Sequence, residues 1–359
     1  LGKKVGVCAL SHKVVRNLLK AIVQAAKKDG VHLESVQKVK DTLGEDACIT
    51  ESKDNAAVRT ALAEGSTQVV GGTAWLWARE DFFEAVDVLF LDEAGQFPLA
   101  NAAAISQGTR SVVLVGDPQQ LESPIQGTHP EGVEVSALHH VLAGKKTIPP
   151  ELGLFIAETR RLAPGICRFT SEQFYEGRLG PFSGTERQVL AGHPIFHGAG
   201  LWFAPTPHTG NRNTSPEEVE RVRELVDSLT GPGVTWTDSD GNTHPLTQKD
   251  ILVVAPYNAH VAALRRALPG MAIGTVDKFQ GQEAAVVVYS MATSSPEDAP
   301  RGMDFLYSLN RLNVATSRAR CACILVANPG LLEPDCRTPT QMRLANSFCR
   351  YREIACRVG

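Results

Sequence analysis

The stretch VLFLDEAGQ (Val88–Gln96) is a run of four apolar residues followed by two adjacent acids, Asp92 and Glu93. A hydrophobic strand that ends in polar residues is typical of a parallel sheet, in which ligands bind outside the carboxyl ends of the strands. Aspartate at that place suits a magnesium ion, and the neighbouring glutamate can accept a proton from an attacking water. The pair predicts a site for a magnesium-bound nucleotide, although a solvated acidic turn explains the pair alone equally well.

The next strand along the chain ends in the same way. In VVLVGDPQQL (Val112–Leu121), Asp117 and Gln120 follow directly after an apolar run. A glutamine at this place can hydrogen-bond both a terminal phosphate and the water that attacks it. Two consecutive strands with such ends are hard to explain as surface turns, so together they strengthen the prediction of a nucleotide site.

Apolar runs and helical patterns alternate from end to end, which favours parallel sheets covered by helices. The chain has 359 residues, enough for about two domains of roughly 100–200 residues each. The loop AGKKTIPPELG (143–153) separates two such series, so we predict an α/β fold with domains at residues 1–150 and 151–359. In the second domain, SPEEVERVRELVDSL predicts a helix that Ser215 caps and in which Glu218 completes a capping box.

Composition limits the classes of protein to which the chain can belong. Hydrophobic residues make up 43% and charged residues 21%, as in an ordinary globular protein with a core. A net charge of -3 gives no general support for nucleic-acid binding, which must then depend on local groups. The longest apolar run, 284–292, is far shorter than the roughly 20 residues of a membrane helix. The eight cysteines include no CxxC pair, which favours idle thiols in a reducing compartment, so we expect a cytoplasmic protein without a membrane segment.

Two more segments carry groups suited to a nucleotide. In KFQGQE, Gly281 permits close approach of the backbone to a ligand, and Glu283 could accept hydrogen bonds from ribose hydroxyls. In NRLNVATSRAR, Arg311 and Arg318 are seven residues apart and so lie on nearly the same face of a helix. Arginine stabilises the charge that develops during phosphoryl transfer, although a surface salt bridge is the commoner role of a single arginine.

Taken in order, segments of this kind resemble the motifs of superfamily 1B DNA helicases along nearly the whole chain. The segments are VCALSHKVVRNLL, VVGGTAWLW, VLFLDEAGQ, VLVGDPQQL, ETRRLAPGICRFTSEQFYEGRL, VVAPYNAH, GTVDKFQGQE and NRLNVATSRAR. Gly72–Leu76, Asp92–Gln96 and His129–Pro130 are similar to the helicase part of bacterial proteins that fuse a RecB-like nuclease to the motor. The resemblance implies two RecA-like domains that use ATP and Mg²⁺ to move along single-stranded DNA, 5′ to 3′, with a nuclease domain upstream in the same polypeptide.

The resemblance also implies a role for each matching residue of the ATP site. Asp92 and Glu93 would be the Walker B pair, with Asp92 on the magnesium ion and Glu93 activating the water. Gln120 would sense the terminal phosphate of ATP. Arg161 and Arg318 would both reach ATP from the second domain.

Three further residues would border the nucleotide, namely Asp117, Gly281 and Glu283. The motif that contains Arg161 departs from the family pattern at two positions. Arg160 stands where an aromatic residue is usual, and Ala163 stands where a histidine is usual.

On the nucleic-acid side, the resemblance implies six contact residues: Ser11, His12, Thr73, Tyr257, Asn258 and Thr275. Ser11 and His12 open a helix, where unpaired N–H groups favour a phosphate, although Ser11 could equally serve only as the cap. Tyr257 could stack on a base, a contact worth roughly 1–3 kcal/mol in single-strand binders. Taken alone, a tyrosine in this position is more often a half-buried packing residue.

The phosphate-binding loop G-x-x-x-x-G-K-[ST] is absent from the sequence. Gly2–Lys3 has nothing in front of it, and Gly144–Lys145 is followed by Lys146 where serine or threonine belongs. In the family this loop lies just upstream of the strand KVGVCAL, so the chain is expected to be truncated immediately after it. Such a fragment should bind ATP weakly and hydrolyse it at background rates. It should also expose apolar surface where a strand is missing, which favours dimerisation.

Two other classes of function fit parts of the sequence. A non-catalytic module that binds single-stranded nucleic acid or a partner protein would account for the missing loop. Five residues argue against it, because a module without ATPase activity has no need of them all: Asp92, Glu93, Gln120, Arg161 and Arg318. An RNA-directed helicase is the other alternative, since the same superfamily also acts on RNA and no residue here separates the two substrates.

Overall fold

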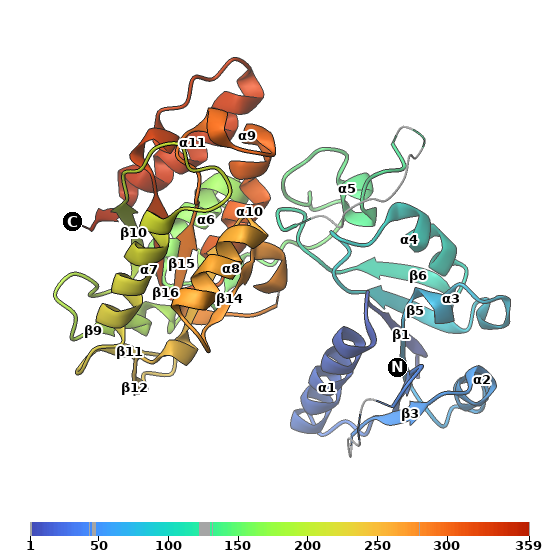
Figure 1. Ribbon diagram of the computed structural model, residues 1–359. Helices are drawn as coiled ribbons and strands as arrows, with labels where there is room; N and C mark the ends of the chain where they lie inside the picture. Colours follow the sequence, from blue (N-terminus) through green and yellow to red (C-terminus); the bar gives the residue numbers. More distant parts are fainter. Residues whose placement is uncertain are drawn as a thin grey trace. The chain divides into compact units, whose positions relative to one another are not determined.

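The computed structural model describes residues 2–42, 44, 48–121, 130, 132–279 and 281–358. The chain divides into two compact units, Leu1–Lys145 and Lys146–Gly359, each built around its own parallel sheet (Figure 1). The predicted α/β fold with two parallel-sheet units is confirmed. His129, in the dipeptide that supported the resemblance to nuclease fusions, lies outside the described residues.

The first unit contains a six-stranded sheet with the order β3-β2-β4-β1-β5-β6, in which every pair of neighbours is parallel. The strands are β1 (Val5–Cys8), β2 (Ser35–Lys38), β3 (Thr50–Ser52), β4 (Val69–Gly72), β5 (Val86–Leu91) and β6 (Thr109–Leu114). The helices are α1 (His12–Lys28), α2 (Asn55–Glu64), α3 (Ala74–Trp77), α4 (Leu99–Ser106) and α5 (Ala137–Leu142). Because the strands are parallel, the segments that follow them all emerge at one edge of the sheet.

Helix α1 packs closely on this sheet. Its first turn is capped by the side chain of Ser11, which accepts a hydrogen bond from the N–H of Val14 at 3.3 Å. Its apolar side chains Val15 and Leu19 are fully buried in the core of the unit. A Cβ atom on Gly71 of β4 would lie only 2.6 Å from Val15 Cγ1, so this approach of helix to sheet requires glycine.

Strand β6 is an edge strand of the sheet and, within the described residues, pairs with β5 alone. Apolar side chains along it are exposed, notably Val112, Val113 and Val115, and so is Phe90 on the neighbouring strand. An apolar edge strand with unpaired backbone groups is a common site of association with another strand. Apolar side chains are thus exposed on this strand, while the missing strand and dimerisation through this surface stay predictions.

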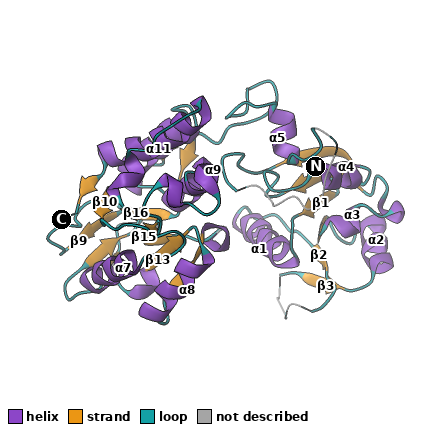
Figure 2. Cartoon of the chain, turned by 45° about the horizontal axis from the view of Figure 1, so that its top comes forward, coloured by secondary structure: helices purple, strands orange, loops and turns teal. Residues whose placement is uncertain are grey.

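The second unit contains a six-stranded parallel sheet with the order β14-β13-β15-β16-β10-β17. Its strands are β10 (Gly200–Pro205), β13 (Ile251–Ala255), β14 (Ala272–Thr275), β15 (Ala284–Ser290), β16 (Ala319–Ala327) and β17 (Cys356–Arg357). Its helices are α6 (Pro164–Phe174), α7 (Pro216–Leu229), α8 (Asn258–Ala267), α9 (Gly302–Leu306), α10 (Leu309–Ser317) and α11 (Pro339–Ile354). Figure 2 shows α7 and α8 on one side of this sheet and α11 on the other.

Two smaller sheets accompany it, one of β9 (Val189–Ala191), β11 (Thr235–Thr237) and β12 (Thr243–Pro245), the other of β7 (Glu158–Thr159) and β8 (Gly180–Pro181). The central strands β13 and β15 are buried at every position, as parallel strands covered on both faces should be. Among the helices that the structure describes in either unit, none combines the length and the apolar character needed to cross a membrane.

Helix α7 begins as predicted at Ser215, whose side chain accepts a hydrogen bond from the N–H of Glu218 at 3.1 Å. The predicted capping box is wrong in its second half. The side chain of Glu218 turns into the unit and is fully buried, where it accepts hydrogen bonds from Ser290 and Ala292 instead of from the backbone of Ser215. These partners lie more than 70 residues further along the chain, so local sequence could not reveal them.

Candidate functional site

The loops that follow β5 and β6 lie directly against each other. The N–H of Ala94 donates a hydrogen bond to the carbonyl oxygen of Val115 at 2.9 Å. A Cβ on Gly95 would lie 2.6 Å from the carbonyl oxygen of Asp117, and one on Gly116 would lie 2.8 Å from the nitrogen of Ala94. Because both glycines are needed for this contact, the motifs DEAGQ and GDPQQ form one structure at the carboxyl edge of the sheet.

Asp92 is placed to hold a cation. Its Oδ1 accepts a hydrogen bond from the N–H of Glu93 at 3.0 Å. Burial raises the pKa of Asp92, against the smaller opposing effect of that hydrogen bond. Within the described residues no cationic side chain forms an ion pair with it. A half-buried carboxylate in this setting fits a cation that supplies the missing positive charge.

This loop pair offers carboxylates of the kind that magnesium binds. No group of three or more His, Cys, Asp or Glu side chains within the described residues could hold a metal ion. Mg²⁺ keeps several waters and is usually bound through one or two carboxylates together with the phosphates of the substrate. Asp92 and the acids near it therefore fit a magnesium–nucleotide complex.

Glu93 adopts a left-handed backbone conformation, with φ of +54°. Non-glycine residues rarely adopt this conformation, which costs on the order of 1–3 kcal/mol and is concentrated at functional sites. The amide of Gln96 donates to Glu93 Oε2 at 3.3 Å. In the adjoining loop, Asp117 accepts hydrogen bonds from the N–H of Gln119 at 2.9 Å and from the amide of Gln120 at 3.1 Å. Gln120 is thus held by Asp117 in this structure.

In the second unit, Glu283 binds two arginines. Arg161 Nε donates to Glu283 Oε2 at 2.5 Å, and Arg320 pairs with the other carboxylate oxygen. Desolvation by itself would raise the pKa of Glu283, but the hydrogen bonds and charges of Arg320 and Arg161 outweigh it and lower that pKa. The carboxylate that the sequence assigned to ribose is therefore occupied by two guanidinium groups.

Gly281 and Arg318 were also predicted to belong to the nucleotide site. Gly281 lies two residues before Glu283, and Arg318 contacts Ala284, the residue after Glu283. Arg318 follows α10 and is only 2% exposed, and its carbonyl oxygen accepts a hydrogen bond from the N–H of Ala284. Gly281 has φ of +74°, and a Cβ there would meet no atom within 4 Å. Gly281 is thus needed for its backbone conformation, while the space beside it is open.

Ser11, His12 and Thr73 line a single pocket of about 390 Å³ in the first unit. It lies at the carboxyl ends of β1 and β4, which are adjacent and pair Cys8 with Gly72. The structure thus brings together the three residues of this unit that the resemblance assigned to nucleic acid. Their contact with nucleic acid stays a prediction.

The three residues of the second unit with the same assignment also lie at neighbouring strand ends, since β13 pairs with β14 up to Ala255 and Thr275. Asn258 is exposed at the start of α8. Tyr257 is only 7% exposed, and its ring lies 5.5 Å from that of Phe305. In this structure Tyr257 is a packing residue, because its ring is too deeply buried to stack on a base.

A stack of charged and aromatic side chains next to Tyr257 was not predicted from the sequence. The guanidinium groups of Arg301 and Arg311 lie 3.8 and 4.1 Å from the centroid of Phe305. Arg311 also lies 4.0 Å from Asp277. The spacing of Arg301, Phe305 and Arg311 is visible in the sequence. It does not predict the stack, because the arrangement of two short helices brings the three side chains together.

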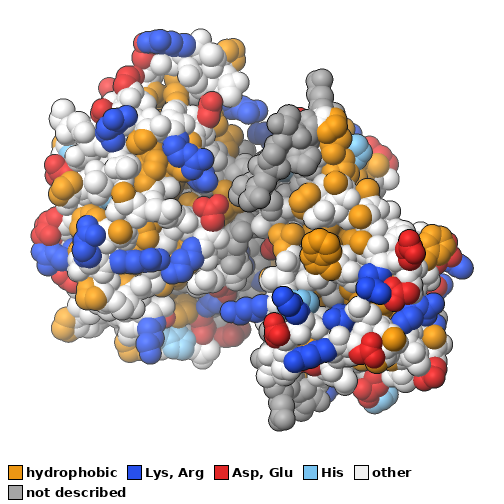
Figure 3. All heavy atoms as spheres, turned by 45° about the vertical axis from the view of Figure 1, so that its right-hand side comes forward, with side chains coloured by type: hydrophobic (Ala, Val, Ile, Leu, Met, Phe, Trp, Pro, Cys, Tyr) orange, Lys and Arg blue, Asp and Glu red, His pale blue; other side chains and the backbone are white. Residues whose placement is uncertain are grey.

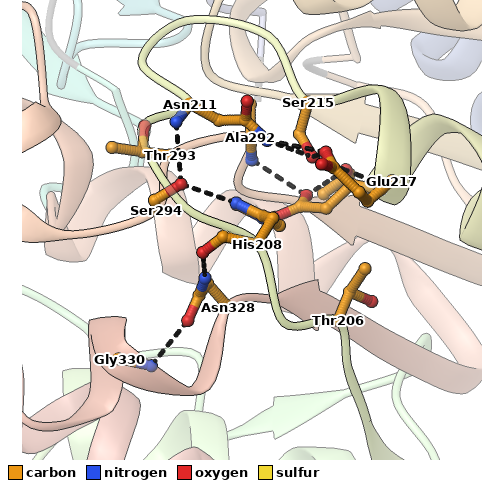
Figure 4. A network of polar contacts seen from close by, with 12 residues as sticks. Thr206, His208, Asn211, Ser215, Glu217, Ala292, Thr293, Ser294, Asn328 and Gly330 are labelled. Atoms are coloured by element: carbon orange, nitrogen blue, oxygen red, sulfur yellow. Dashed lines mark hydrogen bonds and ion pairs between the residues drawn. The ribbon is translucent and has the colours of Figure 1, made fainter.

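A buried polar cluster lies at the carboxyl ends of β10 and β15 in the same sheet (Figure 4). Glu218 Oε2 accepts from Ser290 Oγ at 2.5 Å and from the N–H of Ala292 at 2.8 Å, while Oε1 lies 3.0 Å from His208 Nε2. The other ring nitrogen of His208 lies 2.7 Å from Ser294 Oγ. The cluster joins α7, the end of β15 and the loop after β10, so it is a structural tie between segments distant in sequence.

Known proteins match both units. A family model described as "AAA domain" matches residues 150–330, and another with the same description matches residues 24–126. "Putative helicase mov-10-B.1" of Danio rerio is 27% identical over 290 residues, 69% of this chain and 28% of its own length. "Helicase sen1" of Schizosaccharomyces pombe is 28% identical over 265 residues, 69% of this chain and 15% of its own length.

"DNA replication ATP-dependent helicase/nuclease JHS1" of Arabidopsis thaliana is 26% identical over 283 residues, 72% of this chain. That match covers 20% of the length of the plant protein. The chain thus spans less than a third of each of these relatives, between 15% and 28%.

Proposed function

Because this chain belongs to the AAA domain family and is similar to proteins named as helicases, we propose that it is the motor core of a superfamily 1, ATP-dependent helicase acting on single-stranded DNA. The observation that supports this most is the pair of loops after β5 and β6. Their mutual contact through Gly95 and Gly116 gathers Asp92, Glu93 and Asp117 at one edge of a parallel sheet. Such an edge is where α/β proteins bind nucleotides.

In the proposed mechanism, Asp92 would hold a magnesium ion, and the bound ion would supply positive charge to the phosphates of ATP. Glu93 accepts the proton of the attacking water. Gln120 leaves its hydrogen bond with Asp117 and bonds the terminal phosphate when ATP is present. In the second unit, Arg161 would stabilise the charge that develops on that phosphate, and Arg318, which is only 2% exposed in this structure, would do so after a rearrangement that uncovers it.

We further propose that Glu283 positions Arg161 and does not bind ribose. Its carboxylate is already engaged by Arg161 and Arg320. Removing it would take the ion pair from both arginines and leave the side chain of Arg161 with its hydrogen bond to the carbonyl oxygen of Ser317 at 3.3 Å, so its orientation would be held less firmly. The proposed loss would then appear in kcat more than in the affinity for ATP.

The finer features of the function are also proposals. Movement in the 5′ to 3′ direction comes from the resemblance to superfamily 1B. A nuclease in the same polypeptide is supported by the resemblance and by the name of the Arabidopsis thaliana relative, a helicase/nuclease. The 359 residues contain no G-x-x-x-x-G-K-[ST] loop, so we expect that by themselves they hydrolyse ATP only at background rates.

Strand displacement by the full-length gene product tests the proposal. Duplexes with a 5′ DNA tail, a 3′ DNA tail or a 5′ RNA tail are incubated with and without ATP. We expect ATP-dependent displacement from the 5′ DNA tail. Displacement from the RNA tail alone would establish the RNA-directed alternative. Tight binding to a tail without displacement of any duplex would establish the non-catalytic module, which the missing loop favours.

A further inference from the structure

Trp75 is the most conspicuous side chain of the first unit that the proposed function leaves unexplained. It lies in α3, where Leu76 and Trp77 are buried. The indole of Trp77 is fully buried and donates a hydrogen bond to the carbonyl oxygen of Val7 at 3.2 Å. Trp75 is instead 89% exposed, whereas Trp202 and Trp236 of the second unit are both buried. An exposed tryptophan of this kind often marks a binding site, because its large apolar surface is otherwise left in water.

The surroundings of Trp75 favour a nucleotide over an apolar partner. Trp75 borders the pocket of about 390 Å³ that also contains Ser11, His12, Thr73 and Asn101. This volume lies in the range of roughly 300–1,000 Å³ that is usual for small-molecule sites. A flat aromatic face beside hydroxyl, amide and imidazole groups matches a nucleotide, which has an aromatic base and a polar backbone. Figure 3 shows that hydrophobic side chains on the surface of the first unit lie among charged ones.

The polar side of the pocket also has the character of a site for an anion. It is formed by the N-terminus of α1, a helix of 17 residues with no acidic residue in its first turn. Lys13 is exposed in that turn. His12 Nδ1 is shielded from solvent and has no hydrogen-bond partner among the described residues. A buried polar atom without a partner is costly, so a bound group that satisfies it would be favoured.

We propose that Trp75 stacks on a base of the single-stranded nucleic acid while α1 and His12 face its backbone. The inference depends on the proposed function, and adds a base-contacting residue to a surface where the resemblance indicated only Ser11, His12 and Thr73. Stacking on an aromatic side chain tolerates every base, because each base has an aromatic face. Trp75 thus gives affinity without sequence preference.

Binding to oligothymidylate tests the proposal, with the full-length gene product followed by fluorescence anisotropy at fixed salt. Trp75→Ala should raise Kd by about 5- to 150-fold, which corresponds to the roughly 1–3 kcal/mol of one stacked base. Trp75→Phe should recover part of the affinity. Phe83→Ala is the matched control, since Phe83 is an exposed aromatic of the same unit outside the pocket. It should leave Kd unchanged.

An abasic oligonucleotide of the same length separates stacking from other roles of Trp75. The wild type should prefer the oligonucleotide with bases, and Trp75→Ala should lose that preference while keeping the same dependence of Kd on salt. Equal affinity of wild type and Trp75→Ala for oligothymidylate would overturn the inference but leave the proposed function standing. So would a change in sedimentation on Trp75→Ala without a change in Kd, because the tryptophan would then contact protein. Absence of binding by the wild type would refute the proposed function itself.

Discussion

Replacing Glu218 by alanine should strongly destabilise the second unit. The side chain is 0% exposed, and its removal takes a buried partner from three groups: Ser290 Oγ, which keeps His260 Nε2 at 2.8 Å, the N–H of Ala292 and His208 Nε2. Each buried group left unsatisfied costs about 1–3 kcal/mol. Water that enters the cavity would relieve part of this cost. Breaking a buried charged contact typically costs about 3–5 kcal/mol, and this is the loss in unfolding free energy that we expect.

Hydrogen exchange of amides in β15 and β16 is the appropriate assay, because it reports unfolding of this unit separately from the other. Glu220→Ala is the matched control, since Glu220 lies on the same helix but is exposed and pairs with Arg223 at the surface. It should leave the exchange of both strands unchanged. A loss below about 1 kcal/mol for Glu218→Ala would refute the reasoning, because it would mean that the three donors find other acceptors at no cost.

Three other predictions concern the nucleotide site. Burial raises the pKa of Asp92 in the folded unit. The contribution of Asp92 to the free energy of unfolding is therefore fully present below about pH 4 and is lost as the pH rises through the folded pKa. Asp92→Asn should therefore raise the thermal midpoint of the first unit at pH 7 without Mg²⁺, and the gain should vanish near pH 4. The arginines lower the pKa of Glu283, so its contribution is present above about pH 4.3 and lost as the pH falls through the folded pKa. Glu283→Gln should cost the second unit no more than about 1 kcal/mol at pH 7 in urea unfolding, because the pair is partly exposed, and the cost should shrink as the pH falls through the folded pKa. Gly116→Ala should cost the first unit about 1–3 kcal/mol in the same assay, because its Cβ would press on the nitrogen of Ala94. An unchanged midpoint for that variant would show that the two loops separate freely.

The fold could be predicted because its signals are local. Apolar runs that end in polar residues define β5 and β6, and Ser215 gives the start of α7 through a cap three residues long. The side chain of Glu218 was assigned wrongly for the opposite reason. A capping box is a local pattern, whereas Ser290 and Ala292, which bind the same carboxylate, lie more than 70 residues further along the chain.

The candidate site could be predicted only in part, for similar reasons. That Asp92 and Asp117 lie at one edge of a sheet follows from parallel strands. The contact between the loops at Gly95 and Gly116 could not be predicted in this way, because it depends on the register of β5 and β6. The sequence also does not show which of Trp75 and Trp77 is exposed, because packing alone decides this for two tryptophans in one helical turn.

The central claim is that Asp92 and Glu93 belong to an ATP-hydrolysing motor driven along single-stranded DNA. The most direct measurement is ATP hydrolysis by the full-length gene product with and without single-stranded DNA, compared with Glu93→Gln and with Glu80→Gln as an exposed control in the same unit. We predict that DNA stimulates hydrolysis and that Glu93→Gln lowers kcat by about 100-fold or more while ATP still binds, as for loss of a general base. The control should behave as wild type. Hydrolysis that DNA does not stimulate, or that Glu93→Gln leaves unchanged, would contradict the claim.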